Sequence, residues 1–143
     1  MGVVARTYDP WHTCFRINIA TGVLVECAKM LRPRFAFGVC GIGHLVYACG
    51  GKDREIKTDE TTERYDMLKN KWTLLPECCN MDAAACIDVA VFKSFIYGFG
   101  GRYNGRKGKP DTSFERFLRL DTNSLQKGWK TLNLPNPSGI IGF

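Results

Sequence analysis

One phrase occurs twice in this chain: an apolar stretch closed by two adjacent glycines. LVYACGG ends at Gly51 and FIYGFGG ends at Gly101, so the copies lie 50 residues apart. Self-similarity at a fixed period of about 20 to 50 residues is typical of repeat proteins such as solenoids and propellers. Because stacked units contact only their neighbours, the function of such a chain is expected in the surface that the units present to a partner.

The repeat extends past the glycines. In each unit an Arg, an apolar residue and an Asp follow the Gly-Gly pair, and a Trp follows these. The positions are Arg64, Tyr65, Asp66 and Trp72 in one unit, and Arg119, Leu120, Asp121 and Trp129 in the next. A weaker copy lies upstream at 16–18, with Leu24 and Val25 where a Trp is expected. Each unit therefore predicts two strands joined by a turn, a variable loop after Gly-Gly, a third strand, a short turn and a Trp-bearing strand.

Physical chemistry explains these residue types. A Gly-Gly pair at a strand end permits a positive φ and lets neighbouring backbone approach closely. Large and small apolar residues alternate over 45–49, as expected of a strand buried on both faces. Tyr65 and Trp72 supply the large apolar area with which thin sheets pack together. Strand and turn signals alone would also fit a generic antiparallel β domain, whereas the ordered repeat favours stacked sheets.

The succession of Arg34, HLVYACGG, ERYD and Trp72, followed by FIYGFGG, RLD and Trp129, resembles the kelch repeat family of β-propellers over about residues 14–134. The resemblance implies an all-β fold, an incomplete kelch-type β-propeller of four-stranded antiparallel blades, which usually serves as a protein-binding platform. It assigns the repeat-defining positions to Gly50, Gly51, Tyr65, Asp66, Trp72, Gly100, Gly101, Asp121 and Trp129. The sequence departs from the pattern at Ala84, which stands where the preceding unit has Arg34, and in the missing upstream Trp.

Length limits how much of a propeller the chain can form. Propellers close with about 4 to 8 blades, whereas 143 residues at this period hold just under three. We expect the second half of a blade over 1–33, blades over 34–83 and 84–136, and the start of a further blade or a tail over 137–143. The chain is therefore expected to be a fragment of a longer polypeptide, or to be completed by another copy or a partner that covers its outer sheet faces.

Composition agrees with a soluble globular protein, because 45% of the residues are hydrophobic and 24% are charged. No apolar run approaches the roughly 18 residues that a membrane span needs. The N-terminal MGVVARTYDPW lacks the apolar core of a signal peptide. We expect a cytoplasmic protein that does not bind a membrane.

Seven cysteines, Cys14, Cys27, Cys40, Cys49, Cys78, Cys79 and Cys86, show no C-x-x-C spacing. An odd, scattered set is typical neither of a disulfide framework nor of a zinc site. Cys40 and Cys49 lie in apolar runs, where free Cys behaves as a small core residue. A metal site built from Cys78, Cys79 and Cys86 is disfavoured, because adjacent thiolates rarely chelate one ion tetrahedrally. A redox-sensitive thiol is the remaining alternative, and we expect neither a metal nor a cofactor.

Catalytic chemistry finds little support in the sequence. His12 and His44 are the histidines, and His44 lies in a predicted turn at 41–44. Neither has a nucleophile or carboxylate partner at a recognisable spacing, and the glycine runs do not follow the dinucleotide-binding pattern. We therefore predict a protein that is not an enzyme and has no catalytic residues. The alternative is a propeller segment of an enzyme whose active site lies in other blades.

Positive charge gathers after the second Gly-Gly pair. Lys and Arg exceed Asp and Glu by six, which favours acidic partners. The candidate partner-binding residues in the loop RYNGRKGKPDTS are Arg102, Tyr103, Arg106, Lys107 and Lys109. The equivalent loop of the preceding unit, KDREIKTDETT, carries both signs and should emerge on the same face, where loops commonly bind partners. A solvated loop and a phosphate contact to nucleic acid are the alternatives. A second basic series, Arg16, Arg64 and Arg119, is expected on exposed strand positions, paired with acids such as Glu63 and Glu115.

We therefore predict a non-catalytic protein-binding or scaffolding module built of kelch repeats, within a longer chain or a larger assembly. The partner is expected to be a protein with an acidic surface, and nucleic acid is the weaker candidate. A structural component of a nucleoprotein or cytoskeletal complex is a further alternative, which salt-dependent binding to RNA or acidic filaments would distinguish.

Overall fold

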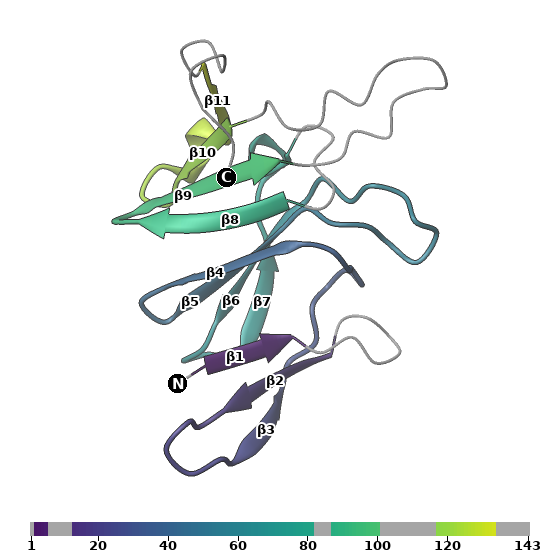
Figure 1. The fold of residues 1–143 in the computed structure, drawn as a ribbon, viewed down its shortest axis with the longest axis vertical. Coiled ribbons are helices and arrows are strands. Elements are labelled where there is room, and N and C mark those ends of the chain that lie inside the picture. The colour runs from purple at the N-terminus through teal and green to yellow at the C-terminus, as the bar shows by residue number, and fades with distance from the viewer. Residues whose placement is uncertain (1, 6–12, 82–86, 101–116, 134–143) are drawn as a thin grey trace, which may run out of the picture.

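The computed structural model describes residues 2–5, 13–81, 87–100 and 117–133, which form three antiparallel sheets that follow one another along the long axis of the molecule (Figure 1). The first sheet contains β1 (Gly2–Ala5), β2 (Cys14–Ile17) and β3 (Leu24–Cys27). The second contains β4 (Gly38–Ile42), β5 (Leu45–Cys49), β6 (Thr62–Asp66) and β7 (Lys71–Leu74). The third contains β8 (Ile87–Phe92), β9 (Phe95–Gly100), β10 (Phe117–Asp121) and β11 (Lys130–Leu132). Two short 3-10 turns, η1 (Glu77–Cys79) and η2 (Leu125–Lys127), follow β7 and β10.

Strands that are neighbours in each sheet are also neighbours in the sequence, so the second and third sheets are four-stranded meanders. This confirms the predicted all-β class and its four-stranded antiparallel sheets. The tight turns between β4 and β5, β6 and β7, and β8 and β9 lie at one end of the sheets (Figure 1). The linker that enters the second sheet lies at the opposite end, together with the loop after Gly51. The limits predicted for the repeat units stay a prediction.

The turns after β6 and β10 use the repeated aspartate in the same way. The Asp66 carboxylate accepts backbone N–H bonds from Leu68 at 2.9 Å and Lys69 at 3.2 Å. The Asp121 carboxylate accepts the N–H of Asn123 at 3.0 Å. Such a side chain satisfies turn amides that no strand partner reaches. The aspartate of the repeat phrase therefore ends a strand and shapes the turn that follows.

Side chains of β5 alternate between two apolar cores. Val46 and Ala48 face the core shared with the first sheet, whereas Tyr47 and Cys49 face the core shared with the third sheet. The first core also contains Cys14, Cys27, Met30, Tyr65 and Trp72. The second also contains Leu75, Cys79, Met81, Ile96, Leu118 and Leu120. Successive strand residues point to opposite faces, and the structure confirms that segment 45–49 is buried on both sides. Burying one large apolar side chain stabilises by about 1.5–3 kcal/mol, so these cores hold neighbouring sheets together.

Trp72 and Trp129 each donate a hydrogen bond to the part of the chain that precedes their own sheet. The Trp72 indole packs on Tyr65, with ring centres 5.1 Å apart, and its Nε1–H donates to the Ala28 carbonyl at 2.9 Å. The Trp129 Nε1–H donates to the Thr62 hydroxyl oxygen at 3.2 Å. Trp72 lies within β7, whereas Trp129 precedes β11. The first sheet has Leu24 at the position that corresponds to Trp72, because Leu24 pairs with Ile17 just as Trp72 pairs with Tyr65. Unlike Trp72, Leu24 is exposed.

Backbone crowding explains the first Gly-Gly pair. Gly50 and Gly51 are buried and have φ of 64° and 105°. A Cβ on Gly51 would lie 2.8 Å from the Phe35 carbonyl oxygen and 2.8 Å from Cβ of Phe37. Residues with side chains rarely adopt such a φ, and no space remains for a methyl group. Gly100 ends β9, and Gly101 lies outside the described residues.

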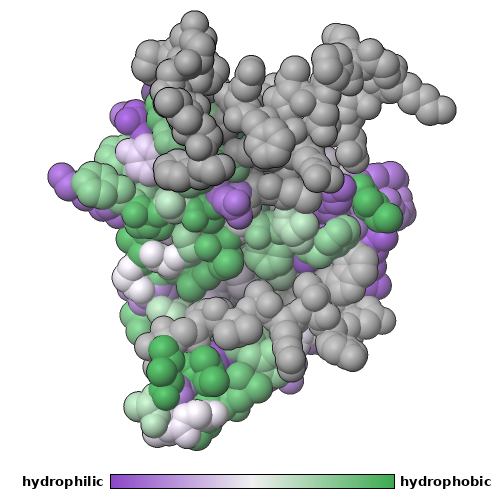
Figure 2. Space-filling model, viewed as in Figure 1, coloured by the Kyte–Doolittle hydropathy of each residue, from purple (hydrophilic) through white to green (hydrophobic). Residues whose placement is uncertain are grey.

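The hairpin formed by β2 and β3 exposes apolar side chains. Ile19, Val23, Leu24 and Val25 are each more than two-fifths exposed, and Figure 2 shows apolar residues gathered at this end of the molecule. Monomeric soluble proteins rarely show contiguous apolar patches of more than a few hundred Å². Within the described ranges, no helix is long and apolar enough to cross a membrane.

Candidate functional site

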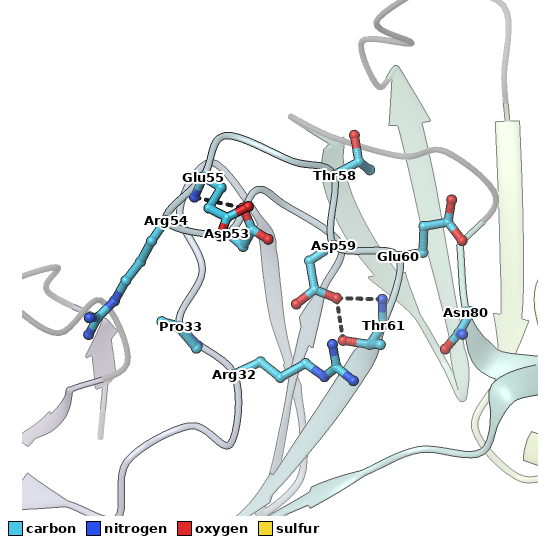
Figure 3. A pocket seen from close by; sticks show the side chains of 10 residues that line it. All are labelled: Arg32, Pro33, Asp53, Arg54, Glu55, Thr58, Asp59, Glu60, Thr61 and Asn80. Carbon is cyan, nitrogen blue, oxygen red and sulfur yellow. Dashed lines mark hydrogen bonds between the residues drawn. The ribbon is translucent and has the colours of Figure 1, made fainter.

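An open hollow of about 550 Å³ lies beside the loop that follows the first Gly-Gly pair (Figure 3). Its walls come from the linker before β4, the loop between β5 and β6, and the segment after η1. The lining residues are Arg32, Pro33, Asp53, Arg54, Glu55, Thr58, Asp59, Glu60, Thr61 and Asn80. Loops on a rigid scaffold are common binding elements, so this hollow is the candidate functional site.

Backbone bridges bring the linker and the loop together. Lys52 bridges to Phe35 and to Thr58, in antiparallel fashion. The Phe35 N–H donates to the Lys52 carbonyl at 2.9 Å, and the Lys52 N–H donates back at 2.9 Å. These bonds extend the pairing of the second sheet beyond β4 and β5. The bridges therefore hold the linker that carries Arg32 and Pro33 next to the loop over 53–61.

Two aspartates hold the loop in shape. The Asp53 carboxylate accepts the N–H groups of Glu55 and Lys57, both at 2.9 Å. The Asp59 carboxylate accepts the N–H of Thr61 at 2.9 Å and also its hydroxyl (Figure 3). Both aspartates act as turn-forming acceptors, so the loop is ordered before any partner binds.

A buried ion pair lies beneath the hollow. Arg34 and Glu63 are fully buried, and the Arg34 guanidinium is 2.7 Å from the Glu63 carboxylate. The guanidinium also donates to the carbonyls of Gly50 and Thr61, both at 2.8 Å. The Glu63 carboxylate further accepts the backbone N–H groups of Leu31 at 2.7 Å and Arg32 at 3.0 Å. Buried charges require such pairing, and here it fixes the linker against β6.

The hollow is lined by charges of both signs, and two of its carboxylates already have partners, since Asp59 lies 3.7 Å from the buried Arg34 guanidinium and Glu55 pairs with Lys57. Its lining carries the carboxylates Asp53, Glu55, Asp59 and Glu60 against the guanidiniums Arg32 and Arg54. Figure 3 shows the Arg54 side chain extending away from the other lining residues. Within the part of the chain that the structure describes, no group of three His, Cys, Asp or Glu residues could hold a metal ion. The arrangement supplies charge and shape for recognition.

The basic loop predicted to bind a partner, with Arg102, Tyr103, Arg106, Lys107 and Lys109, lies outside the described residues. Its flanking strands are described. β9 ends and β10 begins where Phe99 pairs with Phe117. This is the end of the third sheet that corresponds to the Gly-Gly end of the second sheet, where Cys49 pairs with Thr62. The role of the loop stays a prediction.

The second basic series does not pair as expected. Glu63, the expected partner at the surface, is instead buried against Arg34, so this expectation is wrong. The Arg119 guanidinium lies 4.9 Å from the centre of the Phe95 ring, an attractive cation–π distance. Arg64 faces Tyr47 across the β5–β6 pair. Burial raises the pKa of the Tyr47 hydroxyl, and the positive charge of Arg64 opposes this rise. Arg16 is half-buried on β2, and Glu115 and Ala84 lie outside the described residues.

Six cysteines are described, and none of these six is part of a disulfide. Cys14, Cys27, Cys49 and Cys79 are buried, Cys40 is half-buried, and Cys78 is exposed. Burial raises the pKa of the Cys14 thiol to about 11 and that of Cys40 to about 12. A raised pKa leaves little thiolate at neutral pH, so Cys14 and Cys40 are poor nucleophiles. Cys86 lies outside the described residues, as does His12, whereas His44 is exposed in the turn between β4 and β5.

Sequence reasoning did not find the hollow. Its walls come from segments that become neighbours only through pairing of Phe35 with Lys52. The signal in the sequence is the mixed charge of KDREIKTDETT, a segment that supplies seven of the ten lining residues. Opposite charges in one loop are usual on any solvated surface, so that signal alone predicts no site.

Comparison with known proteins agrees with the geometry. The family described as Kelch motif matches residues 33–78, which include the second sheet and the hollow loop. The chain is 30% identical to Kelch repeat and BTB domain-containing protein 2 of Horsepox virus, over 91% of this chain and 26% of that protein. It is 29% identical to the protein of the same name from Ectromelia virus (strain Moscow), over 79% of this chain and 20% of that protein.

A vertebrate relative matches a shorter stretch. Kelch-like protein 15 of Gallus gallus is 40% identical over 41% of this chain and 12% of its own length. The chain thus spans about a quarter or less of the length of these curated relatives. Its stacked four-stranded antiparallel sheets, its Gly-Gly strand ends and these matches agree with one another. The chain belongs to the kelch repeat family.

Proposed function

We propose that this chain is a non-catalytic protein-binding module whose contact face is the end of the sheets that carries the hollow. The single observation behind the proposal is the ordered hollow itself, built by a loop and a linker on a rigid sheet. Kelch repeats form a protein-interaction fold, and relatives named for kelch repeats and a BTB domain support a protein partner in general terms.

The partner proposed for this face carries both signs of charge. The hollow has four carboxylates, of which Asp59 and Glu55 already pair with Arg34 and Lys57, and two guanidiniums, and we propose that it takes a lysine or arginine side chain of the partner. The predicted basic loop over 102–109, attached to the neighbouring sheet, suits an acidic surface. Such a pair of opposite patches fixes the orientation of the partner as well as its affinity.

A photo-crosslinking experiment tests the contact face. A crosslinking amino acid is placed at Glu60, which is exposed at the hollow, or at Leu68, which is exposed in a turn at the opposite end of the sheets. We expect covalent capture of the partner from Glu60 and none from Leu68. Equal capture from both positions, or capture from Leu68 alone, contradicts the proposed face. Weaker capture from Glu60 at high salt is expected, because surface charges are screened.

We further propose that the module acts in the cytoplasm, within a longer chain or a larger assembly. The free thiols support a reducing compartment, and the exposed apolar hairpin of the first sheet supports a covering neighbour. Light scattering of the 143-residue chain across a dilution series tests the second point. We expect self-association that covers the exposed hairpin, and a monodisperse monomer at every dilution contradicts it.

A further inference from the structure

Two adjacent cysteines lie at the contact between the second and third sheets. Cys78 is exposed and Cys79 is buried, although both belong to η1. Their thiols donate to one acceptor, the Leu125 carbonyl oxygen of η2, at 3.4 Å from Cys78 Sγ and 3.2 Å from Cys79 Sγ. Both thiols therefore bond to one carbonyl oxygen in the segment between β10 and β11.

The two sulfurs are also close enough to influence each other. Burial raises the pKa of the Cys79 thiol to about 11, and the neighbouring Cys78 sulfur adds to that rise. In contrast, Cys14 and Cys27 face each other across β2 and β3, but both are buried. Among the described cysteines, the pair in η1 thus combines two neighbouring sulfurs with access from solvent.

Backbone around this pair connects the two sheets tightly. The Cys79 carbonyl accepts the Thr62 hydroxyl at 2.8 Å, and Thr62 in turn accepts the Trp129 indole N–H at 3.2 Å. On the other side, a Cβ built on Gly128 would lie only 1.8 Å from the Cys78 carbonyl oxygen. A change in the backbone of η1 would therefore alter the hydrogen bond of Trp129 to Thr62, which connects the third sheet to the second.

We propose that Cys78 and Cys79 form a peroxide-sensitive vicinal dithiol that loosens the contact between the second and third sheets when it is oxidised. The exposed Cys78 sulfur attacks hydrogen peroxide: an S–O bond forms, the O–O bond breaks, and the departing hydroxide leaves as water after gaining the thiol proton. Cys78 loses two electrons and becomes a sulfenic acid, while the peroxide is reduced. The Cys79 sulfur then attacks the Cys78 sulfur, an S–S bond forms, and the S–O bond breaks with release of a second water.

Oxidation removes both S–H donors from the Leu125 carbonyl. A disulfide between adjacent residues also closes a ring that includes their peptide group, so the η1 backbone must change. The bond from Thr62 to the Cys79 carbonyl is then disturbed, and the Trp129 indole loses its fixed partner. Trp72, which donates to the Ala28 carbonyl on the other side of the second sheet, is not connected to this chain of bonds.

The experiment exposes the full folded chain to hydrogen peroxide, blocks the remaining thiols, and maps the cysteines by mass spectrometry. We expect a disulfide within the peptide that contains Cys78 and Cys79, a loss of about two mass units, with Cys14 and Cys27 reduced. The indole N–H resonance of Trp129 in a nuclear magnetic resonance spectrum should move and return after addition of a reductant. The Trp72 resonance is the internal control and should stay in place.

Variants separate resolution by Cys79 from simple oxidation of an exposed thiol. In Cys79→Ser we expect Cys78 to proceed to sulfinic acid, whereas the unmodified chain stops at the disulfide. Equal over-oxidation of Cys78 in both chains overturns the proposal, as does an unreactive Cys78 or a disulfide to any other cysteine. A disulfide that leaves the Trp129 resonance unmoved overturns the proposed coupling. If Cys79→Ser does not fold, the disulfide map of the unmodified chain still decides.

Discussion

Gly51→Ala tests the physical basis of the repeated Gly-Gly pair. Two effects act at this position: Gly51 has φ of 105°, and the new Cβ would lie 2.8 Å from both the Phe35 carbonyl oxygen and the Phe37 Cβ. Strain at such a backbone conformation costs about 1–3 kcal/mol. Extra volume in a packed site costs about 1–3 kcal/mol more. The substitution should therefore lower the free energy of unfolding by about 2–6 kcal/mol.

Gly43→Ala is the matched control. Gly43 also has a positive φ, 60°, but a Cβ built there meets nothing within 4 Å. Gly43→Ala should therefore lower the free energy of unfolding through backbone strain alone, by about 1–2 kcal/mol. The difference between the two variants isolates the close approach of the 35–37 backbone to the Gly-Gly strand end.

Urea denaturation followed by tryptophan fluorescence measures both variants, with thermal unfolding as a second readout. For a domain of this size, 1 kcal/mol corresponds to a change in Tm of about 2–4 °C. If Gly51→Ala proves no more destabilising than Gly43→Ala, the glycine is not required by close packing, and the explanation given for the repeat is wrong.

Three further substitutions or conditions test the interior. Glu63→Gln should destabilise by about 3 kcal/mol, because it removes the carboxylate that lies 2.7 Å from the buried Arg34 guanidinium and leaves only the Asp59 carboxylate, at 3.7 Å; Glu55→Gln, in an exposed pair, should leave the urea midpoint unchanged. Trp72→Phe should cost about 1 kcal/mol in unfolding free energy, because it removes the indole donor to the preceding linker while keeping an aromatic ring; an unchanged midpoint contradicts this role. Ionisation of the Cys14 and Cys40 thiols should lower stability by about 1.4 kcal/mol per pH unit for each thiol, from pH 9 up to about 11 for Cys14 and up to about 12 for Cys40, because their folded-state pKa values, about 11 and about 12, exceed the unfolded value of 9.0. In Cys40→Ala the alkaline loss, followed by denaturation at each pH, should be smaller.

Local patterns predicted the strands and the glycines, because these depend on residues near one another. Alternation over 45–49 is a property of one strand, and the structure places its two sets of side chains in two cores. The glycine at position 51 indicates a backbone site with no space for a side chain, and the atoms that fill this space belong to Phe35 and Phe37. Asp66 shapes a turn within its own neighbourhood. The interactions responsible lie mostly within one repeat unit.

The Glu63 pair could not be predicted in the same way. A glutamate next to an arginine on a strand has the pattern of a surface pair, and nothing local indicates that the linker amides of Leu31 and Arg32 lie over it. The partner Arg34 is distant in the sequence, and the linker must fold back before the carboxylate is enclosed. The hollow has the same origin, because its walls meet only after the sheet and the linker have formed.

The direction in which the tryptophans reach has a consequence for synthesis of the chain. Trp72 donates to Ala28, and Trp129 donates to Thr62, so each bond points from a later sheet to an earlier one. A ribosome makes the earlier segment first, and domains fold as their residues emerge. When the second and third sheets form, the acceptor of each tryptophan has therefore already been made. The sheets can therefore dock in the order in which they are translated. This order shortens the time during which their apolar surfaces are exposed to solvent.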